Sequence, residues 1–344
     1  PDGFRVELVA AEPSFANPVA FWPANDGAFY VAETFRHHQG VTDIRDHMDW
    51  LDDYLAAKTV ADRVAYFRKQ LGERFSEMET AYDRVSLLRD TDGDGVVDRS
   101  TPFSTAFTGA AAGIAAGVLE HHGDVFVTSI PSVWRLRDTN HDDVADETTE
   151  LMTGFGVHVA LLGHDMHGLV IGPDERLYFS IGDRGFDVKT KDAELHHPQC
   201  GAVLRCELDG SKLEVFATGL RNPQELAFDD FGDLFTGDNN SDGGDRARLV
   251  HVVEGGDSGW RQSYQWITEP ALRGPWNEEK LWYPHFEGQA AYLVPPIANF
   301  ADGPSGLTID PGTGCPERWR GRLFLCDFRG DASTSGVHAI ELER

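Results

Sequence analysis

A phrase that recurs five times along the chain constrains the fold more than any other feature of the sequence. Each copy has a small residue, an apolar alternation, a turn that contains Gly, Asp or Pro, and a second alternating run that is rich in aromatic residues. The copies are residues 17–33, 113–129, 167–183, 222–238 and 304–327. Period-2 alternation on both sides of a turn is typical of a β-hairpin. Five such hairpins predict an all-β fold.

The distance between the copies selects one architecture among the all-β folds. The second runs of the three middle copies end at Ser129, Asp183 and Asp238, which are 54 and 55 residues apart. Four-stranded units that repeat at about this length are typical of a β-propeller, and a β-sandwich built from similar hairpins is the alternative. We predict one all-β domain over residues 1–344, a six-bladed-type β-propeller in which five blades are recognisable and the last is truncated.

The two ends of the chain bear on how the ring of blades closes. Residues 336–344 are expected to form the last strand of the fifth blade. Residues 4–10 are expected to form an extra strand that pairs with the final blade. The first residue is Pro1 rather than Met, so a leader has been removed or the chain has been cut, and we expect a secreted or periplasmic protein.

Two segments interrupt the blades. Residues 43–82 carry apolar side chains at helical spacing, with Thr59 and Asp62 as a capping box and Gly72 as a C-cap, so a helical insertion is predicted in the first blade. Residues 256–300 form a second insertion that concentrates Trp and Tyr. Such rings fill gaps between blades or form a wall on which a sugar stacks, and packing is the favoured interpretation.

The charge of the chain limits its partners. The sequence has 30 Lys and Arg against 57 Asp and Glu, which gives a formal net charge of −27 at pH 7. A field of this sign repels phosphate backbones and attracts cations, so nucleic acid is not an expected partner. With 41% hydrophobic residues the chain can form a packed core. No apolar stretch is long enough to be a transmembrane segment.

The four cysteines are too few for a disulfide scaffold, and their spacing matches no haem or zinc motif. Cys206 and Cys326 fall on strand patterns and are expected to be buried free thiols, whereas Cys200 and Cys315 lie in loops. A bridge within either neighbouring pair, Cys200–Cys206 or Cys315–Cys326, stays open.

Residues 90–98, DTDGDGVVD, have the spacing of a calcium-binding loop. Carboxylates stand at positions 1, 3, 5 and 9, a glycine at position 6 allows a sharp turn, and a backbone carbonyl supplies a further oxygen. Position 12 is Thr101 instead of the Glu of an EF-hand, and the flanks are strand-like. A solvated acidic turn is the alternative to a structural calcium site. The predicted ligands are Asp90, Asp92, Asp94, Val96 and Asp98.

A second copy of this loop follows 48 residues later, at residues 138–146, DTNHDDVAD. The strand residues before the two loops match as well, which independently supports the blade repeat. Asp143 replaces the turn glycine and His141 enters the loop, so a second calcium site and a plain acidic turn both stay open. The predicted ligands are Asp138, Asn140, Asp142 and Asp146.

Three further segments are dense in polar groups that core packing does not need: residues 163–185, 219–229 and 238–260. In a propeller, the loops before the innermost strands meet at one end of the central channel. The register of the repeat places four side chains there, those of His164, His167, Arg221 and Asn222. A His beside an Arg suits proton abstraction with stabilisation of negative charge. Capping of the loop backbone is the alternative role for both histidines.

These segments resemble the soluble quinoprotein glucose and sorbosone dehydrogenases, which are six-bladed propellers that bind pyrroloquinoline quinone (PQQ). The shared phrases are HxxGxLxxGPDxxxYxxxGD, GxRNP, and an Asn-Ser-Asp segment that ends in GGxxGW. They match His164–Asp183, Gly219–Pro223, and Asn240–Asp242 with Gly255–Trp260. The whole chain is still more similar to the N-terminal dehydrogenase-like domain of large secreted proteins of Planctomycetes and Verrucomicrobia, in which HEAT-like repeats and a c-type haem domain often follow.

The resemblance implies PQQ-dependent oxidation of a sugar or related alcohol. With the GPD turns aligned without a gap, the catalytic base falls on His164, and His167 stands where the enzymes have glycine; the residues alone do not separate the two. Arg221, a catalytic candidate as well, and Asn222 match residues that contact the quinone. Arg329 lies where a contact to a cofactor carboxylate is expected. The alternative for these arginines is to brace neighbouring blades.

By the same resemblance, calcium and PQQ are the cofactors, a sugar-like molecule is the substrate, and a c-type haem domain is the electron acceptor. The chain departs from the enzymes in the stretch 282–295, which has no lysine to match their cofactor-binding lysine. A non-catalytic propeller module that binds a carbohydrate or a protein is the competing interpretation. A hydrolase or lactonase is a third, and it requires carboxylates that converge at the channel centre.

Overall fold

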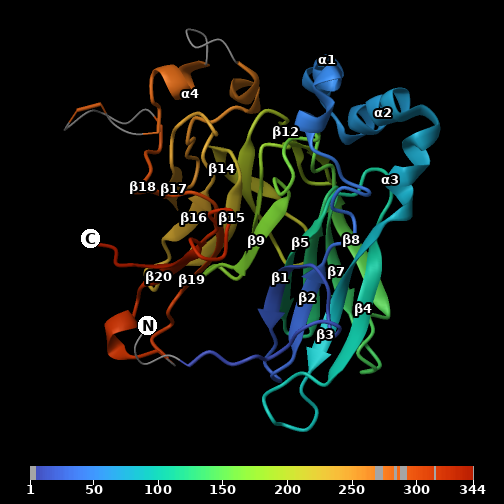
Figure 1. Ribbon diagram of the computed structural model, residues 1–344, viewed down its shortest axis with the longest axis vertical. Helices are drawn as coiled ribbons and strands as arrows, with labels where there is room; N and C mark the ends of the chain where they lie inside the picture. The colour runs from blue at the N-terminus through green and yellow to red at the C-terminus, as the bar shows by residue number, and fades with distance from the viewer. Residues whose placement is uncertain (1–4, 268–273, 283–284, 287–292, 314, 344) are drawn as a thin grey trace. The chain divides into compact units, whose positions relative to one another are not determined.

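The computed structural model describes residues 5–267, 274–282, 285–286, 293–313 and 315–343 (Figure 1). The chain divides into two compact units, which are described separately. Unit 1 comprises Pro1–Thr42 and Phe67–Thr153, and unit 2 comprises Asp43–Tyr66 and Gly154–Arg344.

Unit 1 contains two four-stranded antiparallel sheets in which each strand pairs with the next along the chain. The first sheet consists of β1 (Pro18–Pro23), β2 (Phe29–Glu33), β3 (Tyr82–Arg89) and β4 (Arg99–Thr108). The second consists of β5 (Ala115–His121), β6 (Asp124–Ser129), β7 (Ser132–Arg137) and β8 (Glu147–Thr153). Side chains of the two sheets share one core, with Phe103 and Phe107 from the first and Val127 and Leu136 from the second.

Among its described residues, unit 2 contains three larger sheets and one two-stranded sheet. One has the order β14 (Glu214–Leu220), β13 (Gly201–Cys206), β10 (Leu177–Ile181), β9 (Met166–Ile171), and the hairpin β11 (Phe186–Lys189) and β12 (Glu194–His197) interrupts it in sequence. The next is β15 (Pro223–Phe228), β16 (Leu234–Asp238), β17 (Ala247–Val252) and β18 (Ala298–Ala301). The last consists of β19 (Pro304–Ile309), β20 (Leu323–Asp327) and β21 (Gly336–Ile340).

The five predicted hairpins are the first two strands of the five sheets: β1–β2, β5–β6, β9–β10, β15–β16 and β19–β20. Four of their turns contain a glycine at positive φ, among them Gly27 at 87°, Gly123 at 84° and Gly232 at 84°, a conformation that other residues rarely adopt. The prediction of a β-propeller with five recognisable blades is confirmed, since each blade is one sheet of antiparallel strands that contains one of the repeated hairpins.

The predicted helical insertion is also confirmed. Between β2 and β3 lie η1 (Ile44–Trp50), α1 (Leu51–Ala56), α2 (Val60–Leu71), η2 (Gly72–Ser76) and α3 (Glu77–Thr80). The capping box forms as expected: Thr59 Oγ1 accepts from Asp62 N at 3.1 Å, and Asp62 Oδ2 accepts from Thr59 N at 3.0 Å. Gly72 ends α2 at φ +56°.

Two expectations about local structure are wrong. Residues 5–10 form no strand, because their alternation has no surface to cover: Val6 is 97% and Leu8 70% exposed. Cys326 is exposed rather than buried, because Leu323 and Leu325 take the core-facing positions of β20 and leave the Cys326 side chain on the other face. All four cysteines are free thiols, and no disulfide forms between either pair.

The aromatic insertion, residues 256–300, contributes η3 (Gln262–Trp266) and α4 (Gly274–Glu278). Trp260 and Trp276 are fully buried in a T-shaped contact with ring centroids 5.5 Å apart, as the packing interpretation expects. Tyr283 and Tyr292, two further aromatic residues of this insertion, lie outside the described residues. Within the described part of the chain, no helix combines the length and the apolar character that crossing a membrane requires.

Candidate active site

His164 and Asp183 form a buried pair at one end of the third sheet, in unit 2. His164 lies in the loop before β9 and Asp183 follows β10. Nδ1 of His164 is 2.7 Å from Oδ1 of Asp183, and the two side chains are only 4% and 3% exposed. Because an ionised carboxylate can only accept, Nδ1 of the imidazole carries a proton. Among the described residues, nothing forms a hydrogen bond to Nε2 of His164.

The environment of Asp183 keeps it ionised. Burial by itself raises the pKa of Asp183, but His164, the Arg221 charge and the Trp260 N–H oppose burial and together hold this pKa below its ordinary value. The Trp260 indole N–H donates to Oδ2 at 2.8 Å. An imidazole oriented by an ionised carboxylate is the arrangement of a general base.

The corresponding acids of two other sheets serve a structural purpose. Glu33 ends β2 and pairs with Arg84, which faces it on β3; Asp238 ends β16 and pairs with Arg248, which faces it on β17. When the register of β10 and β13 is extended by two residues, the residue that faces Asp183 is Cys200. The third sheet therefore has a thiol where these two sheets have a guanidinium, and His164 takes the carboxylate instead.

Arg221 and Asn222 lie in the loop between β14 and β15, close to this pair. The backbone carbonyl of Arg221 accepts from the N–H of Asp183 at 2.7 Å. The backbone N–H groups of Arg221 and Asn222 both donate to Asp238, at 3.0 and 2.7 Å, which fixes the loop. The guanidinium of Arg221 donates to Gln265 at 2.8 Å and to Asp242 at 3.0 Å. Among the described residues, the guanidinium hydrogen bonds go to these two side chains and none goes to Asp183 or Asp238.

Gly182 brings His164 and Asn222 side by side. A Cβ on Gly182 would stand 2.8 Å from the His164 carbonyl oxygen and 3.0 Å from Oδ1 of Asn222. Only a residue without a side chain allows the two loops to approach each other this closely. Oδ1 of Asn222 is buried and has no hydrogen-bond partner among the described residues, although such groups are normally paired. The contact at Gly182 therefore holds a buried amide oxygen that has no partner among the described residues.

The structure separates the two histidines. Nε2 of His167 lies 3.0 Å from the carbonyl oxygen of Gly163, which also accepts from the Gln224 amide at 3.2 Å. His167 thus fits the alternative role of a backbone cap, whereas His164 has the carboxylate partner. Neither the Asp183 partnership nor the Trp260 bond was predicted from the sequence. The available signal was Cys200, at the position where two other blades carry Arg.

Arg329 contacts a different set of residues from Arg221 and Asn222. Its Nε donates to Asp327 at 2.8 Å and is 3.5 Å from Asp302, both in or beside the fifth sheet. Among the described residues, the ion-pair partners of Arg329 are these two acids, and it forms no ion pair with Asp183 or Asp242. A cofactor contact of Arg329 stays a prediction.

The first predicted cation loop connects β3 and β4 in unit 1 (Figure 1). One carboxylate oxygen from each of Asp90, Asp92 and Asp94 lies within 4.8 Å of the others. The same acids also cap backbone N–H groups, among them that of Val96, which donates to Asp94 at 2.8 Å. Asp98 instead accepts from Thr91 at 2.7 Å. The loop thus assembles three of the five predicted ligands.

The second predicted cation loop connects β7 and β8. Its caps repeat those of the first loop: Asp138 accepts from the N–H of Asp143 at 2.9 Å, and Asp142 accepts from that of Val144 at 3.0 Å. Asn140 Nδ2 donates to Asp146 at 2.8 Å. The side chain of Asp143, the residue that replaces the glycine, forms ion pairs with Arg89 and Arg99, which lie outside this loop.

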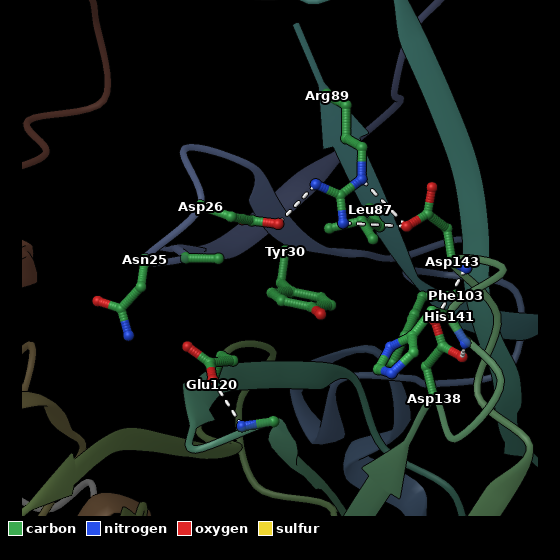
Figure 2. Close-up of a pocket in the computed structure, with 12 residues that line it drawn as sticks. Asn25, Asp26, Tyr30, Leu87, Arg89, Phe103, Glu120, Asp138, His141 and Asp143 are labelled. Carbon is green, nitrogen blue, oxygen red and sulfur yellow. Dashed lines mark hydrogen bonds and ion pairs between the residues drawn. The ribbon is translucent and has the colours of Figure 1, made fainter. Parts of the chain in front are cut away.

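A pocket of about 270 Å³ lies beside the second loop, within unit 1. Figure 2 shows the ring of Tyr30 in it, with Glu120 and His141 at its sides and the Asp26–Arg89 ion pair above. Burial and the nearby Glu120 and Asp26 raise the pKa of Tyr30 to about 12, so its hydroxyl is a neutral hydrogen-bond donor. An aromatic face with hydrogen-bonding groups at its edge suits a small polar ligand.

Comparisons with known proteins agree with this fold. Quinoprotein glucose dehydrogenase B of Acinetobacter calcoaceticus is 29% identical over 194 residues, which are 47% of this chain and 37% of that relative. The chain thus spans well under half of the length of the curated relative that it matches.

Two solved structures share the fold at low sequence identity. The PQQ-bound form of aldose sugar dehydrogenase from Streptomyces coelicolor has a TM-score of 0.52 at 18% identity, over 97% of this chain and 84% of that chain. An oxidoreductase of Thermus thermophilus described as a glucose dehydrogenase has a TM-score of 0.54 at 17% identity, over 98% of this chain and 87% of that chain. Over residues 1–330 the chain matches, and therefore belongs to, the family described as Domain of unknown function (DUF7133).

Proposed function

We propose that the protein oxidises a sugar or a related alcohol in a PQQ-dependent reaction, with His164 as the general base. The observation that carries the proposal is the buried His164–Asp183 pair, in which Nε2 of His164 has no hydrogen-bond partner among the described residues. The similarity to quinoprotein glucose dehydrogenase B supplies the substrate class.

The chain's own groups account for the proton in this reaction. Nε2 of His164 takes the proton of the substrate hydroxyl, and the imidazolium that results is stabilised by Asp183. As the C–H hydrogen leaves with its electron pair, the alcohol carbon becomes a carbonyl. PQQ, held by residues of this site, would supply the acceptor for that hydride. Arg221 would stabilise negative charge that develops on the oxygen.

The residues near His164 fit a polar cofactor. The amide of Asn222 has a buried oxygen with no partner among the described residues. The guanidinium of Arg221 has an exposed carboxylate, that of Asp242, as its ion-pair partner, so a carboxylate of the cofactor can replace Asp242. Arg221 and Asn222 would therefore hold PQQ, with Arg329 as a further predicted contact.

Binding and turnover are tested together by adding PQQ and calcium to the protein. The proposal predicts a quinone absorbance band that stays with the protein, and reduction of an artificial dye when sugars are supplied. Arg221→Met should weaken the binding of PQQ at least tenfold, since one charged hydrogen bond is worth about 1.5–3 kcal/mol. Absence of both the band and dye reduction across the whole sugar panel would contradict the proposal.

Calcium, secretion and a haem partner belong to the same proposal. The three converging carboxylates of residues 90–94 support a structural calcium ion in the first loop, and the matching caps support a weaker site in the second. Secretion and electron transfer to a c-type haem domain rest on the resemblance of the sequence alone.

A non-catalytic carbohydrate-binding module is the second candidate, and the pocket beside Tyr30 favours it. Its ring face and the imidazole of His141 are groups on which sugars are commonly held (Figure 2). If this function is correct, Tyr30→Ala abolishes sugar binding in calorimetry and His164→Asn does not. The reverse result would favour the oxidoreductase.

A further inference from the structure

Trp260 supplies the second hydrogen bond to Asp183. Its Nε1–H donates to Oδ2 at 2.8 Å, and the residue is fully buried. His164 already occupies Oδ1. Each carboxylate oxygen of Asp183 therefore has one side-chain donor, and the plane of the carboxylate is fixed relative to the imidazole.

The chemistry of this donor differs from that in two other blades. Asp238 and Glu33 are bound by the guanidinium groups of Arg248 and Arg84, which cancel their charge. Trp260 donates an equally direct hydrogen bond and carries no charge. The charge of Asp183 thus stays available to the imidazole, and the second carboxylate oxygen still has a donor.

The Trp260 ring has little freedom to turn. It meets Trp276 in a T-shaped contact at 5.5 Å and Tyr264 in another at 6.0 Å. The Arg221 guanidinium lies 5.5 Å from its ring centroid, and the Trp260 backbone N–H donates to the carbonyl of Gly219 at 2.9 Å. The indole N–H is therefore aimed at Asp183 by packing on several sides.

We propose that Trp260 is a positioning residue for the His164–Asp183 pair, which orients the carboxylate and preserves its charge for the imidazole. The inference rests on the proposed function, in which His164 is the base. Nothing in the role requires contact between Trp260 and the substrate.

Few of the other groups that face Asp183 carry a charge at neutral pH. Arg221 is the cation beside it. Burial raises the pKa of Tyr54 and of the Cys200 thiol, and burial lowers the pKa of His158 to about 4, so that all three are neutral near pH 7. A change in the proton affinity of the pair after mutation is therefore attributable to the lost indole bond.

The experiment is an NMR titration of the His164–Asp183 pair in the 344-residue chain without added cofactor. Trp260→Phe removes the N–H and keeps an aromatic ring. Without that donor the ionised carboxylate is less stable. The pH at which the His164–Asp183 pair is half protonated should therefore rise by about half a pH unit or more. Trp276→Phe is the matched control, since Trp276 is equally buried and donates to Asp245 at 3.1 Å.

A rise confined to Trp260→Phe supports the proposal. Equal shifts in both variants, or no shift in either, would overturn it, because packing alone would then explain Trp260. If Trp260→Phe does not fold, the wild-type titration decides: the indole N–H resonance of Trp260 should follow the midpoint of the pair, and that of Trp276 should not. Absent dye reduction with a positive NMR result would refute the proposed function and leave the positioning role intact.

Discussion

At the scale of single residues, the site depends on a difference between blades in the residue that faces the acid at the end of the second strand. In two sheets the acid that ends the second strand faces an arginine on the next strand. In the third sheet Cys200 replaces the arginine, and His164 with Trp260 takes over the acid, Asp183. The sequence pointed to His164 through its resemblance to the quinoprotein enzymes, but the carboxylate partner emerges only when the strands are paired.

Gly182 should tolerate no side chain. Gly182→Ala would place a Cβ 2.8 Å from the His164 carbonyl oxygen, so we expect a loss of about 1–3 kcal/mol in the free energy of unfolding. Urea denaturation measures this loss. Gly336→Ala, where no atom lies within 4 Å of the added Cβ, should change the free energy by less than about 0.5 kcal/mol. Equal effects of the two substitutions would refute the close approach of the loops.

The buried imidazole of His158 should make stability depend on pH. Burial lowers its pKa to about 4 from the ordinary 6.5, so between these values the folded protein binds fewer protons than the unfolded chain. The free energy of unfolding should therefore fall as the pH falls through this window, by up to about 3 kcal/mol from this group. His158→Asn removes the titration and keeps an N–H for the carbonyl of Tyr54, which lies 3.0 Å from Nδ1.

Urea denaturation at pH 7 and pH 4.5 compares the two proteins. The wild type should lose more stability than His158→Asn on acidification. Parallel losses would show that His158 is not the group responsible.

At the scale of structural elements, the two predicted cation loops are variants of one hairpin connection. Both cap their own backbone with acids at equivalent positions, Asp94 to Val96 and Asp142 to Val144. The loops differ at position 6, where Asp143 turns toward arginines of the first sheet. Motif spacing predicted both loops. It did not predict that the Asp143 side chain of the second loop would form ion pairs with arginines outside that loop.

Calcium should stabilise the protein mainly through the first loop. In millimolar calcium we expect the melting temperature to rise by several degrees. Asp94→Asn keeps an oxygen for the Val96 cap but removes a ligand charge, and it should abolish most of that rise. Asp142→Asn makes the same change in the second loop and should remove only a small part. A rise that both variants retain in full would place the ion elsewhere.

At the scale of the whole molecule, the hairpin repeat was sufficient to predict the blades because alternation and turn chemistry are local properties. The helical insertion was predictable for the same reason. The strand prediction for residues 5–10 was wrong because an alternating pattern forms a strand only where a partner surface exists. Val6 and Leu8 remain exposed. The site was only partly predictable, since the bonds of Asp183 to His164 and Trp260 join residues 19 and 77 positions apart.

The measurement that tests the account most directly is the rate of dye reduction by PQQ-loaded wild type, His164→Asn and His167→Asn with a sugar that the wild type oxidises. Loss of a positioned general base costs about 10²–10⁴-fold in rate. We predict a loss of this size in kcat for His164→Asn, and a change of less than about tenfold for His167→Asn, whose side chain caps the Gly163 carbonyl. Full activity of His164→Asn would contradict the central claim.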